Sequence, residues 1–501
     1  MTWSWGLLQV AEQQLGRSVA DEINLLMRRL SARYRRNRTR SDYYDMHNLF
    51  RDLGIAIPPN LRNLEVAMGW PAKAVDQLAR RVRMRAWVLP SGNLADFGVE
   101  DLWAANSLDV AVPQAQVSAL IHSTAFVLAF PGDMQAGEPA VHIRVLDAFD
   151  ATGIWDSGRQ GLRSGLAVLA RSDQDRQPTS VLFAAPNAYA LFTQHRGVWT
   201  VQTMPHGVGR VTMEPLTYRP RLGRPFGSSR ISRAVMAITD SAMRTVVRSE
   251  VSAEFYSAPQ RYILGADEGQ FVGPDGKQKS TWDLVMGRIL ALPDTGNWDD
   301  ANQGRAEVGT FPQITMQPHT DQLRQWAQLM AAETSLPVSA LGIVQDNPSS
   351  AEAIYASKED LLLEAEDCAA GFGTGLIRAM RTAVMLRDGL TTLPPELQGL
   401  AIRWMDPSTP SRAAATDAVM KQVQAGVLPA ESEVTLEQLD YDRATIDRIL
   451  AERRTTAGDA TLQSLAQAAK NVTPQARDLA TQADTGQAAA TAQPSPVAGG
   501  G

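Results

Sequence analysis

The sequence predicts an α+β protein whose sheet and long helices are built from different stretches of the chain. Six short apolar or alternating runs, typical of strands, follow one another between residues 126 and 204. Residues 228–257 instead keep an apolar stripe at helical spacing, and residues 352–388 form a helix-compatible stretch without proline. Between these two stretches lies a polar, strand-like insertion. The fold class therefore combines a largely antiparallel sheet with two long helical regions.

Composition is that of an ordinary, mildly acidic protein with more than one domain. The chain has 501 residues, of which 44% are hydrophobic and 20% charged, and its formal net charge is -6. A protein that grips DNA through many phosphate contacts is usually basic. The single cysteine, Cys368, allows no disulfide within the chain and fits a reducing compartment. No run of about 18 apolar residues and no signal peptide is apparent, so we expect a cytosolic protein with no membrane partner.

Residues 1–40 are predicted to be helical, because Ile23, Leu26 and Leu30 recur along one face. This stretch ends in a basic run made of Arg28, Arg29, Arg33, Arg35, Arg36, Arg38 and Arg40. One interpretation is a contact with nucleic acid or with a capsid shell. The favoured interpretation is a solvated or subunit-facing helix.

The next elements are predicted in turn from proline positions and apolar spacing. A helix begins at Pro71, with Val75, Leu78 and Val82 facing inward. A further helix is expected at residues 114–123. The predicted strands are residues 126–130, 141–146, 166–170, 181–184, 189–193 and 199–204.

A long helix is predicted from Ser228, with Ser228 or Ser229 as its N-cap, to about Ser257. At 1.5 Å per residue its length is roughly 45 Å. Pro259 ends it, and a strand follows at residues 260–265. Residues 265–318 are irregular and strand-like.

The following stretch is predicted to be a helix, a polar loop and a longer helix. From Asp321 one face carries Leu323, Trp326, Leu329 and Met330. Pro337 ends this helix, because the residue before a proline is disfavoured in the α region. A loop rich in helix breakers follows. Ser349 or Ser350 then caps a helix-compatible stretch that continues to about Asp388.

After Gly389, helices are predicted from Ser411 to Gln424, at residues 430–439 and at residues 444–454. From Thr455 the composition is rich in Ala, Thr, Gln and Gly, and this predicts a disordered tail.

Catalytic motifs are scarce in this sequence. The turn before Lys277 lacks the first glycine of a P-loop, and Gln278 stands where Ser or Thr would bind magnesium. The histidines show no zinc-site spacing, and no nucleophile elbow is present. A metal ion could be held by two acidic runs, Asp299-Asp300 and Glu364-Ala-Glu366-Asp367. The favoured interpretation is an exposed loop for the first run and a solvated helix face for the second. We expect no enzymatic activity, no cofactor and no metal, and Cys368 as a small packing residue.

Two blocks of sequence resemble the portal proteins of long-tailed bacteriophages. The first is Pro225-Phe-Gly-Ser-Ser-Arg-Ile231 with Ala258-Pro-Gln-Arg-Tyr-Ile-Leu-Gly265. The second is Thr334-Ser-Leu-Pro-Val-Ser-Ala-Leu-Gly342 with Asn347-Pro-Ser-Ser-Ala-Glu-Ala353. Weaker matches extend the resemblance over about residues 43–454.

The resemblance implies a portal fold with a mixed α/β wing, a two-helix stem, a small β-containing clip and a helical crown. The expected parts are a wing (1–227), first stem helix (228–258), clip (259–317), second stem helix (318–341), tunnel loop (342–351), long wing helix and return (352–406), crown (407–455) and flexible tail (456–501).

It also implies a dodecameric ring at the portal vertex of the capsid, assembled in the host cytoplasm. Double-stranded DNA passes through such a ring during packaging and ejection. The implied partners are the terminase large subunit, a head–tail adaptor, and the major capsid and scaffolding proteins. The tunnel loop would line the channel with Val344, Gln345, Asp346, Asn347, Pro348 and Ser349. These residues include one carboxylate and no cation, so the loop can touch DNA without binding it tightly.

Two alternatives come from other classes of phage protein. A terminase-type ATPase–nuclease would need a phosphate-cradling loop and clustered metal-binding acids, neither of which the sequence displays. Another head–tail structural protein is the second alternative. Such proteins are generally too short to hold the wing, stem, clip and crown in this order.

Overall fold

The computed structural model describes residues 3–47, 66–90, 93–257, 261–264, 307–310, 315–343, 357–408, 412–439, 441, 445–456 and 461–467. The chain divides into two compact units, Met1–Ser408 and Thr409–Gly501. Several predicted features lie outside the described residues. They are the loop residues 344–349, the Ser350 cap, the Asp299-Asp300 pair and most of the insertion between the long helices.

Two N-terminal helices, α1 (Trp3–Leu15) and α2 (Arg17–Tyr44), cover one face of a five-stranded antiparallel sheet. The sheet order is β4 (Ala151–Asp156), β5 (Gly161–Arg171), β6 (Pro178–Ala184), β7 (Ala188–His195) and β8 (Val198–Pro205). Ile23 and Leu26 are fully buried against this face, as their spacing predicted. The single predicted helix is divided at Gly16, whose φ of 89° lies in the left-handed region.

A second, three-stranded antiparallel sheet joins the five-stranded sheet to the helices. Its order is β3 (Val141–Leu146), β2 (Thr124–Pro131) and β9 (Met213–Thr217). One face, with Phe126 and Leu128, packs toward the five-stranded sheet. The other face, with Val127 and Leu216, packs in the main core against α5 (Leu108–His122) and α10 (Glu359–Arg387). The six strands predicted between residues 126 and 204 are confirmed, whereas β4 and β9 of these two sheets were not predicted.

Shorter elements complete the first unit around the main core. Helix α3 (Trp70–Ala79) has Pro71 in its first turn and buries Val75 and Leu78, as predicted. Helix α4 (Val99–Ala105) precedes α5. Strands β1 (Met84–Val88) and β12 (Ala401–Trp404) pair antiparallel. Single 3-10 turns are η2 (Leu94–Phe97), η3 (Met134–Ala136), η5 (Val338–Leu341) and η6 (Glu396–Gly399).

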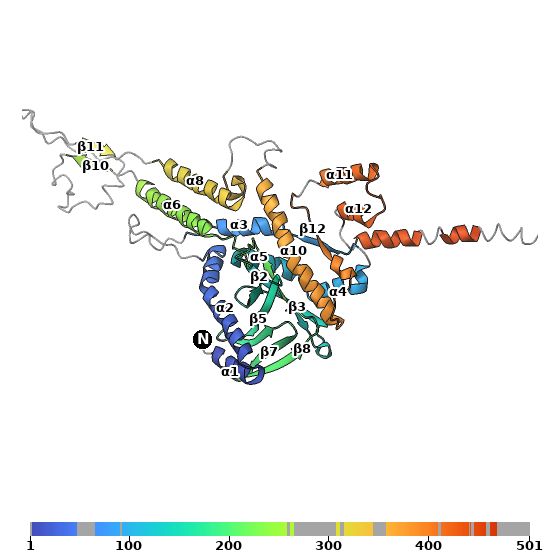
Figure 1. Ribbon diagram of the computed structural model, residues 1–501. Helices are drawn as coiled ribbons and strands as arrows, with labels where there is room; N and C mark the ends of the chain where they lie inside the picture. Colours follow the sequence, from blue (N-terminus) through green and yellow to red (C-terminus); the bar gives the residue numbers. More distant parts are fainter. Residues whose placement is uncertain are drawn as a thin grey trace, which may run out of the picture. The chain divides into compact units, whose positions relative to one another are not determined.

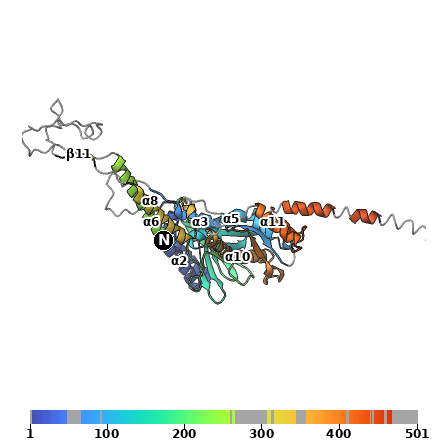
Figure 2. The same cartoon turned by 90° about the horizontal axis from the view of Figure 1, so that it is seen from above.

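The two long helices on either side of the insertion, α6 (Arg233–Ser257) and α8 (Gln317–Thr334), lie side by side (Figures 1 and 2). Trp326 donates its indole N–H to Thr245 Oγ1 at 3.1 Å, and Ser252 Oγ lies 3.3 Å from His319 Nε2. The chain between them includes an antiparallel strand pair, β10 (Arg261–Leu264) and β11 (Glu307–Thr310). A helix pair that brackets a β insertion is therefore confirmed.

Two details of this helix pair differ from the prediction. Helix α6 begins at Arg233 rather than Ser228, and its N-cap is Ser232, whose Oγ accepts from Val235 N at 3.1 Å. Ser229 does not cap α6, because it is bonded to the end of α5 instead. Leu329, predicted to share one apolar face with Leu323, Trp326 and Met330, is 45% exposed.

Gly227 lies where the chain turns toward α6, and its φ is +67°. A Cβ atom added there would lie 2.1 Å from the carbonyl oxygen of Tyr218. Gly227→Ala is therefore expected to lower the free energy of unfolding by more than the ~1–3 kcal/mol of left-handed strain alone. Gly137, at φ +80° with nothing within 4 Å, provides the matched control, because Gly137→Ala adds only that strain. Equal losses in denaturant unfolding would contradict a steric role for Gly227.

The second unit is helical where it is described. Helix α11 (Arg412–Gln424) is followed by Gly426, whose φ is +71°, as expected of a helix end. Ser432 caps α12 (Glu433–Gln438) by accepting from Val434 N at 3.2 Å. Residues 445–456 and 461–467 are also helical. The second of these segments corrects the prediction that the whole tail is disordered. None of the described helices has the length and apolar character needed to cross a bilayer.

Candidate functional site

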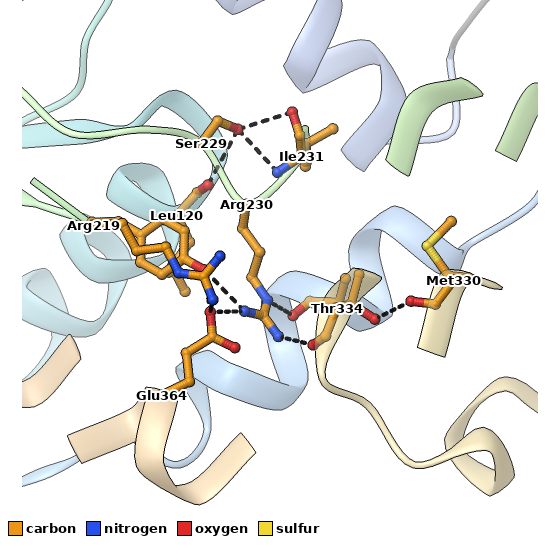
Figure 3. A network of polar contacts seen from close by, with 10 residues as sticks. Leu120, Arg219, Ser229, Arg230, Ile231, Met330, Thr334 and Glu364 are labelled. Atoms are coloured by element: carbon orange, nitrogen blue, oxygen red, sulfur yellow. Dashed lines mark hydrogen bonds and ion pairs between the residues drawn. The ribbon is translucent and has the colours of Figure 1, made fainter. Parts of the chain in front are cut away.

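The predicted tunnel loop residues, Val344, Gln345, Asp346, Asn347, Pro348 and Ser349, lie outside the described residues. The chain on both sides of them is described, however. It enters from α8 through η5 and leaves into α10. The candidate site is therefore the base of this loop, where the two flanking helices meet a buried polar network (Figure 3).

Arg230 is the centre of this network and is only 5% exposed. Its Nε donates to the carbonyl oxygen of Ala74 in α3 at 2.5 Å, and its Nη2 donates to the carbonyl oxygen of Thr334 at 2.6 Å. Its Nη1 donates to the hydroxyl of Tyr218 at 3.1 Å. Backbone carbonyl groups at the end of α8 lack intrahelical donors, so the guanidinium satisfies one of them at Thr334.

Glu364, in the second turn of α10, supplies the negative charge. Its Oε1 lies 2.5 Å from Nη1 of Arg230 and 2.9 Å from Nη2 of Arg219, and it accepts a hydrogen bond from Tyr218 (Figure 3). Its Oε2 is buried and has no hydrogen-bond partner among the residues that the structure describes. This position corrects the sequence interpretation of a solvated acidic face: Glu364 is buried, whereas Glu366 and Asp367 are exposed.

Electrostatics in the network favour one protonation pattern. Burial alone would lower the pKa of Arg230, but Tyr218 and Glu364 outweigh burial and raise it. Burial, followed by the charge of Glu364, raises the pKa of Tyr218, so its hydroxyl remains a donor. A neutral tyrosine and a charged ion pair are therefore kept together inside the protein. Removing either partner of such a buried ion pair lowers the stability of the protein, because the remaining charge stays buried without compensation.

Short-range contacts explain why Arg230 points into the core. The backbone N–H of Arg230 donates to Leu120 O at 2.9 Å, and Ser229 Oγ donates to Ile121 O at 2.5 Å. Both carbonyl groups belong to the last turn of α5, where partners from within the helix are missing. Ser229 Oγ also accepts from Ile231 N at 3.0 Å. The segment before α6 is thus fixed to α5 before the arginine side chain begins.

One side chain consequently joins the helices on both sides of the loop. Arg230 contacts the last residue of α8 and an early residue of α10, and it also binds α3. Among the described residues, no group of three His, Cys, Asp or Glu side chains could hold a metal ion. The contacts of Arg230 position the end of α8, the start of α10 and α3 relative to one another.

Cys368 lies one turn beyond Glu364 and is buried in the main core, which agrees with its predicted packing role. Burial, followed by the charge of Glu364, raises the pKa of its thiol to about 12. The thiolate is the reactive form. At pH 8 the folded protein should therefore react with a thiol reagent on the order of a thousandfold more slowly than the urea-unfolded chain. Comparing 5,5′-dithiobis(2-nitrobenzoate) labelling in both states checks this, and equal rates would contradict the burial.

Sequence reasoning did not find the roles of Arg230, Tyr218, Arg219 and Glu364. One signal for Arg230 was present, because it falls in the Pro225–Ile231 block that resembles portal proteins. Its partner Thr334 also falls in a block that resembles portal proteins, but Arg230 bonds the backbone carbonyl groups of Ala74 and Thr334, and residue type does not reveal such contacts. Tyr218 lies 12 residues before Arg230, whereas Glu364 is far from both in the sequence.

Comparison with known proteins agrees with the resemblance. The family described as phage portal protein, SPP1 Gp6-like, matches residues 24–459. The portal protein of Mycobacterium phage D29 is 29% identical over 401 residues, which cover 79% of this chain and 80% of that protein. The portal protein of Mycobacterium phage L5 is 29% identical over 399 residues, covering 78% and 80% respectively.

A solved structure, the virion of a native gene transfer agent particle, contains a similar chain. The match covers 74% of this chain and 89% of that chain. Its sequence identity is 14% and its TM-score 0.41. The family assignment rests on the sequence match, which spans most of the chain and both blocks that first indicated it. This chain therefore belongs to the phage portal protein family.

Proposed function

We propose that this portal protein assembles into a dodecameric ring at the capsid vertex and that double-stranded DNA passes through the ring during packaging and ejection. The observation that carries the proposal is the Arg230 network, which holds both helices flanking residues 344–356. One buried guanidinium thus joins the described chain before and after these residues, at Thr334 and at Glu364. Membership of the portal family supports the same assignment.

In this proposal the residues Val344, Gln345, Asp346, Asn347, Pro348 and Ser349 line the channel. The ring also docks the terminase large subunit and a head–tail adaptor, and it contacts the major capsid and scaffolding proteins. The protein carries out no catalysis itself, so ATP hydrolysis is left to the terminase. Assembly takes place in the host cytoplasm before the ring becomes part of the virion.

Electron microscopy of the purified protein tests the proposal directly. The expected result is class averages of a ring with an axial hole, together with no ATP hydrolysis above that of buffer. A protein that stays monomeric at micromolar concentration in the presence of scaffolding protein would contradict the ring. Measurable ATP hydrolysis by the purified chain would instead favour the terminase alternative.

A further inference from the structure

An unusual cluster of arginines lines a cavity of about 810 Å³ between α2 and the start of α6. Three of them, Arg33, Arg36 and Arg40, project from successive turns of α2. The other two are Arg224 and Arg233, which lie before and at the start of α6. We call these five residues and the cavity they line the arginine pocket.

The positive charge of the arginine pocket is uncompensated within the described part of the chain. No carboxylate of a described residue lies within 4.0 Å of any of the five guanidinium groups. Arg33 instead lies over the ring of Phe226, 5.3 Å from its centroid, and Arg40 donates to His122 O at 3.3 Å. Glu333 is tied to the region through Ser232 at 2.8 Å but pairs with none of the arginines.

These groups also repel one another. Burial and the charge of Arg36 lower the pKa of Arg40 to about 10. Burial and the charge of Arg224 lower the pKa of Arg36. Arginines that face one another without an acid favour an anionic group from outside the subunit, since opposite charge within a few ångströms relieves the repulsion.

A complementary surface exists on α10. Four exposed carboxylates recur at helical spacing on one side of its first turns and surround Leu363, which is 56% exposed. We call this side the acidic face, and its carboxylates are Glu359, Asp360, Glu366 and Asp367. Among the described residues none of the four forms an ion pair. Asp360 and Asp367 border a second cavity with Arg219 and Arg221, of which Arg219 is already bound to Glu364.

The two surfaces are built from different elements of the same unit. Helix α2 packs against α5, whereas α10 packs on β2 and β9. A closed ring is built from a head-to-tail interface, in which each subunit presents two different faces to its neighbours. Two oppositely charged faces, each without ion-pair partners in the described part of its own chain, fit such an interface.

We propose that the acidic face of α10 in one copy docks on the arginine pocket of the next copy in the ring. This inference rests on the proposed ring function. The acidic face is the favoured occupant because it carries unpaired carboxylates and an exposed leucine that can pack on arginine side-chain stems. The net charge of -6 disfavours nucleic acid as the occupant, since the protein as a whole repels phosphate.

The test reverses the charge on each surface and then on both. The charge of the arginine pocket is reversed by the double variant Arg36→Glu/Arg224→Glu. The charge of the acidic face is reversed by Glu359→Arg/Glu366→Arg. All four residues are exposed, so the substitutions should not prevent folding. Each double variant should raise the protein concentration at half assembly by at least about tenfold in mass photometry at low salt. Combining all four changes should restore assembly to within about threefold of the wild-type protein, because opposite charges face each other again.

The matched control is Arg28→Glu/Arg35→Glu, which makes the same charge change on α2 at exposed positions outside the pocket. It should assemble like the wild-type protein, and far-UV circular dichroism should show all variants folded. If the wild-type protein forms rings and the charge reversals leave assembly unchanged, or if their combination fails to restore it, the interface is wrong and the ring function stands. If the wild-type protein forms no ring, the proposed function itself fails.

The same variants test whether nucleic acid, rather than the acidic face, occupies the arginine pocket. Binding to a fluorescent double-stranded oligonucleotide is followed by anisotropy. A pocket variant that assembles normally but loses oligonucleotide binding would show that the arginines serve phosphate groups, and this would overturn the proposal. Unchanged oligonucleotide binding in a variant with impaired assembly supports it.

Discussion

Replacing Arg230 with methionine should lower the free energy of unfolding by about 3–5 kcal/mol, the usual cost of removing one partner of a buried ion pair. Glu364 would lose the cation 2.5 Å from its Oε1 and would keep only Arg219, whose side chain is 60% exposed. The carbonyl groups of Ala74 and Thr334 would also lose their donor. Urea unfolding followed by fluorescence measures the change. It is best done where the protein is monomeric, because assembly stabilises the folded state.

A double-mutant cycle separates the ion pair from general loss of packing. Arg230→Met/Glu364→Met should be less destabilised than the sum of its two single variants, by about 1–3 kcal/mol, because no uncompensated charge stays buried. Arg221→Met, an exposed change near the same site, is the control and should stay within about 0.5 kcal/mol of the wild-type protein. Additive effects of Arg230→Met and Glu364→Met would mean that the two side chains do not stabilise each other.

Replacing Asp346 with lysine should slow or stall DNA packaging while leaving ring assembly intact. If the loop lines the channel, the substitution turns a ring of carboxylates into a ring of cations that face phosphates. Each new phosphate contact tightens DNA association and steepens its dependence on salt, by about 0.9 in the slope of log K against log salt concentration. Raising the salt concentration should therefore relieve the stall. Packaging rate in a reconstituted terminase assay is the measurement.

Asp346→Asn supplies the matched control, because it removes the negative charge without adding a cation. It should package at nearly the normal rate. Rings of the lysine variant must first be shown complete by electron microscopy. If such rings package DNA at the normal rate, the loop does not meet the DNA, and the assignment of residues 344–349 to the channel fails.

The elements of the fold were largely predictable because their signals are local. Alternating apolar runs gave strands such as β6 and β7, and helical spacing with flanking prolines gave α3 and the α6–α8 pair. Strand β9 was missed because Met213-Glu-Pro-Leu-Thr217 includes a charge and a proline. It tolerates Pro215 because it is an edge strand of its sheet.

The candidate site was harder to predict because its contacts are long-range. Glu364 illustrates both the failure and an overlooked signal. Its neighbours Glu366 and Asp367 suggested a solvated face, yet Glu364 follows Leu361 by three residues and precedes Cys368 by four. Both of those residues are buried, so helical spacing places Glu364 on the core side of α10. Its partner was unpredictable, because no pattern in the sequence relates a carboxylate in α10 to an arginine before α6.

The Arg230 network also determines how the base of the loop would respond to mechanical load. A segment that touches a moving polymer experiences drag, and that drag is transmitted to whatever holds its ends. Here the ends of α8 and α10 are bonded to the same guanidinium, whose backbone N–H is bonded in turn to α5. If residues 344–349 line the channel, drag on them would load these contacts of Arg230 together and pass through Arg230 to α3 and α5. In a variant that lacks the Arg230 contacts, the ends of α8 and α10 would separate under load. The same variant could still be folded when no load is applied.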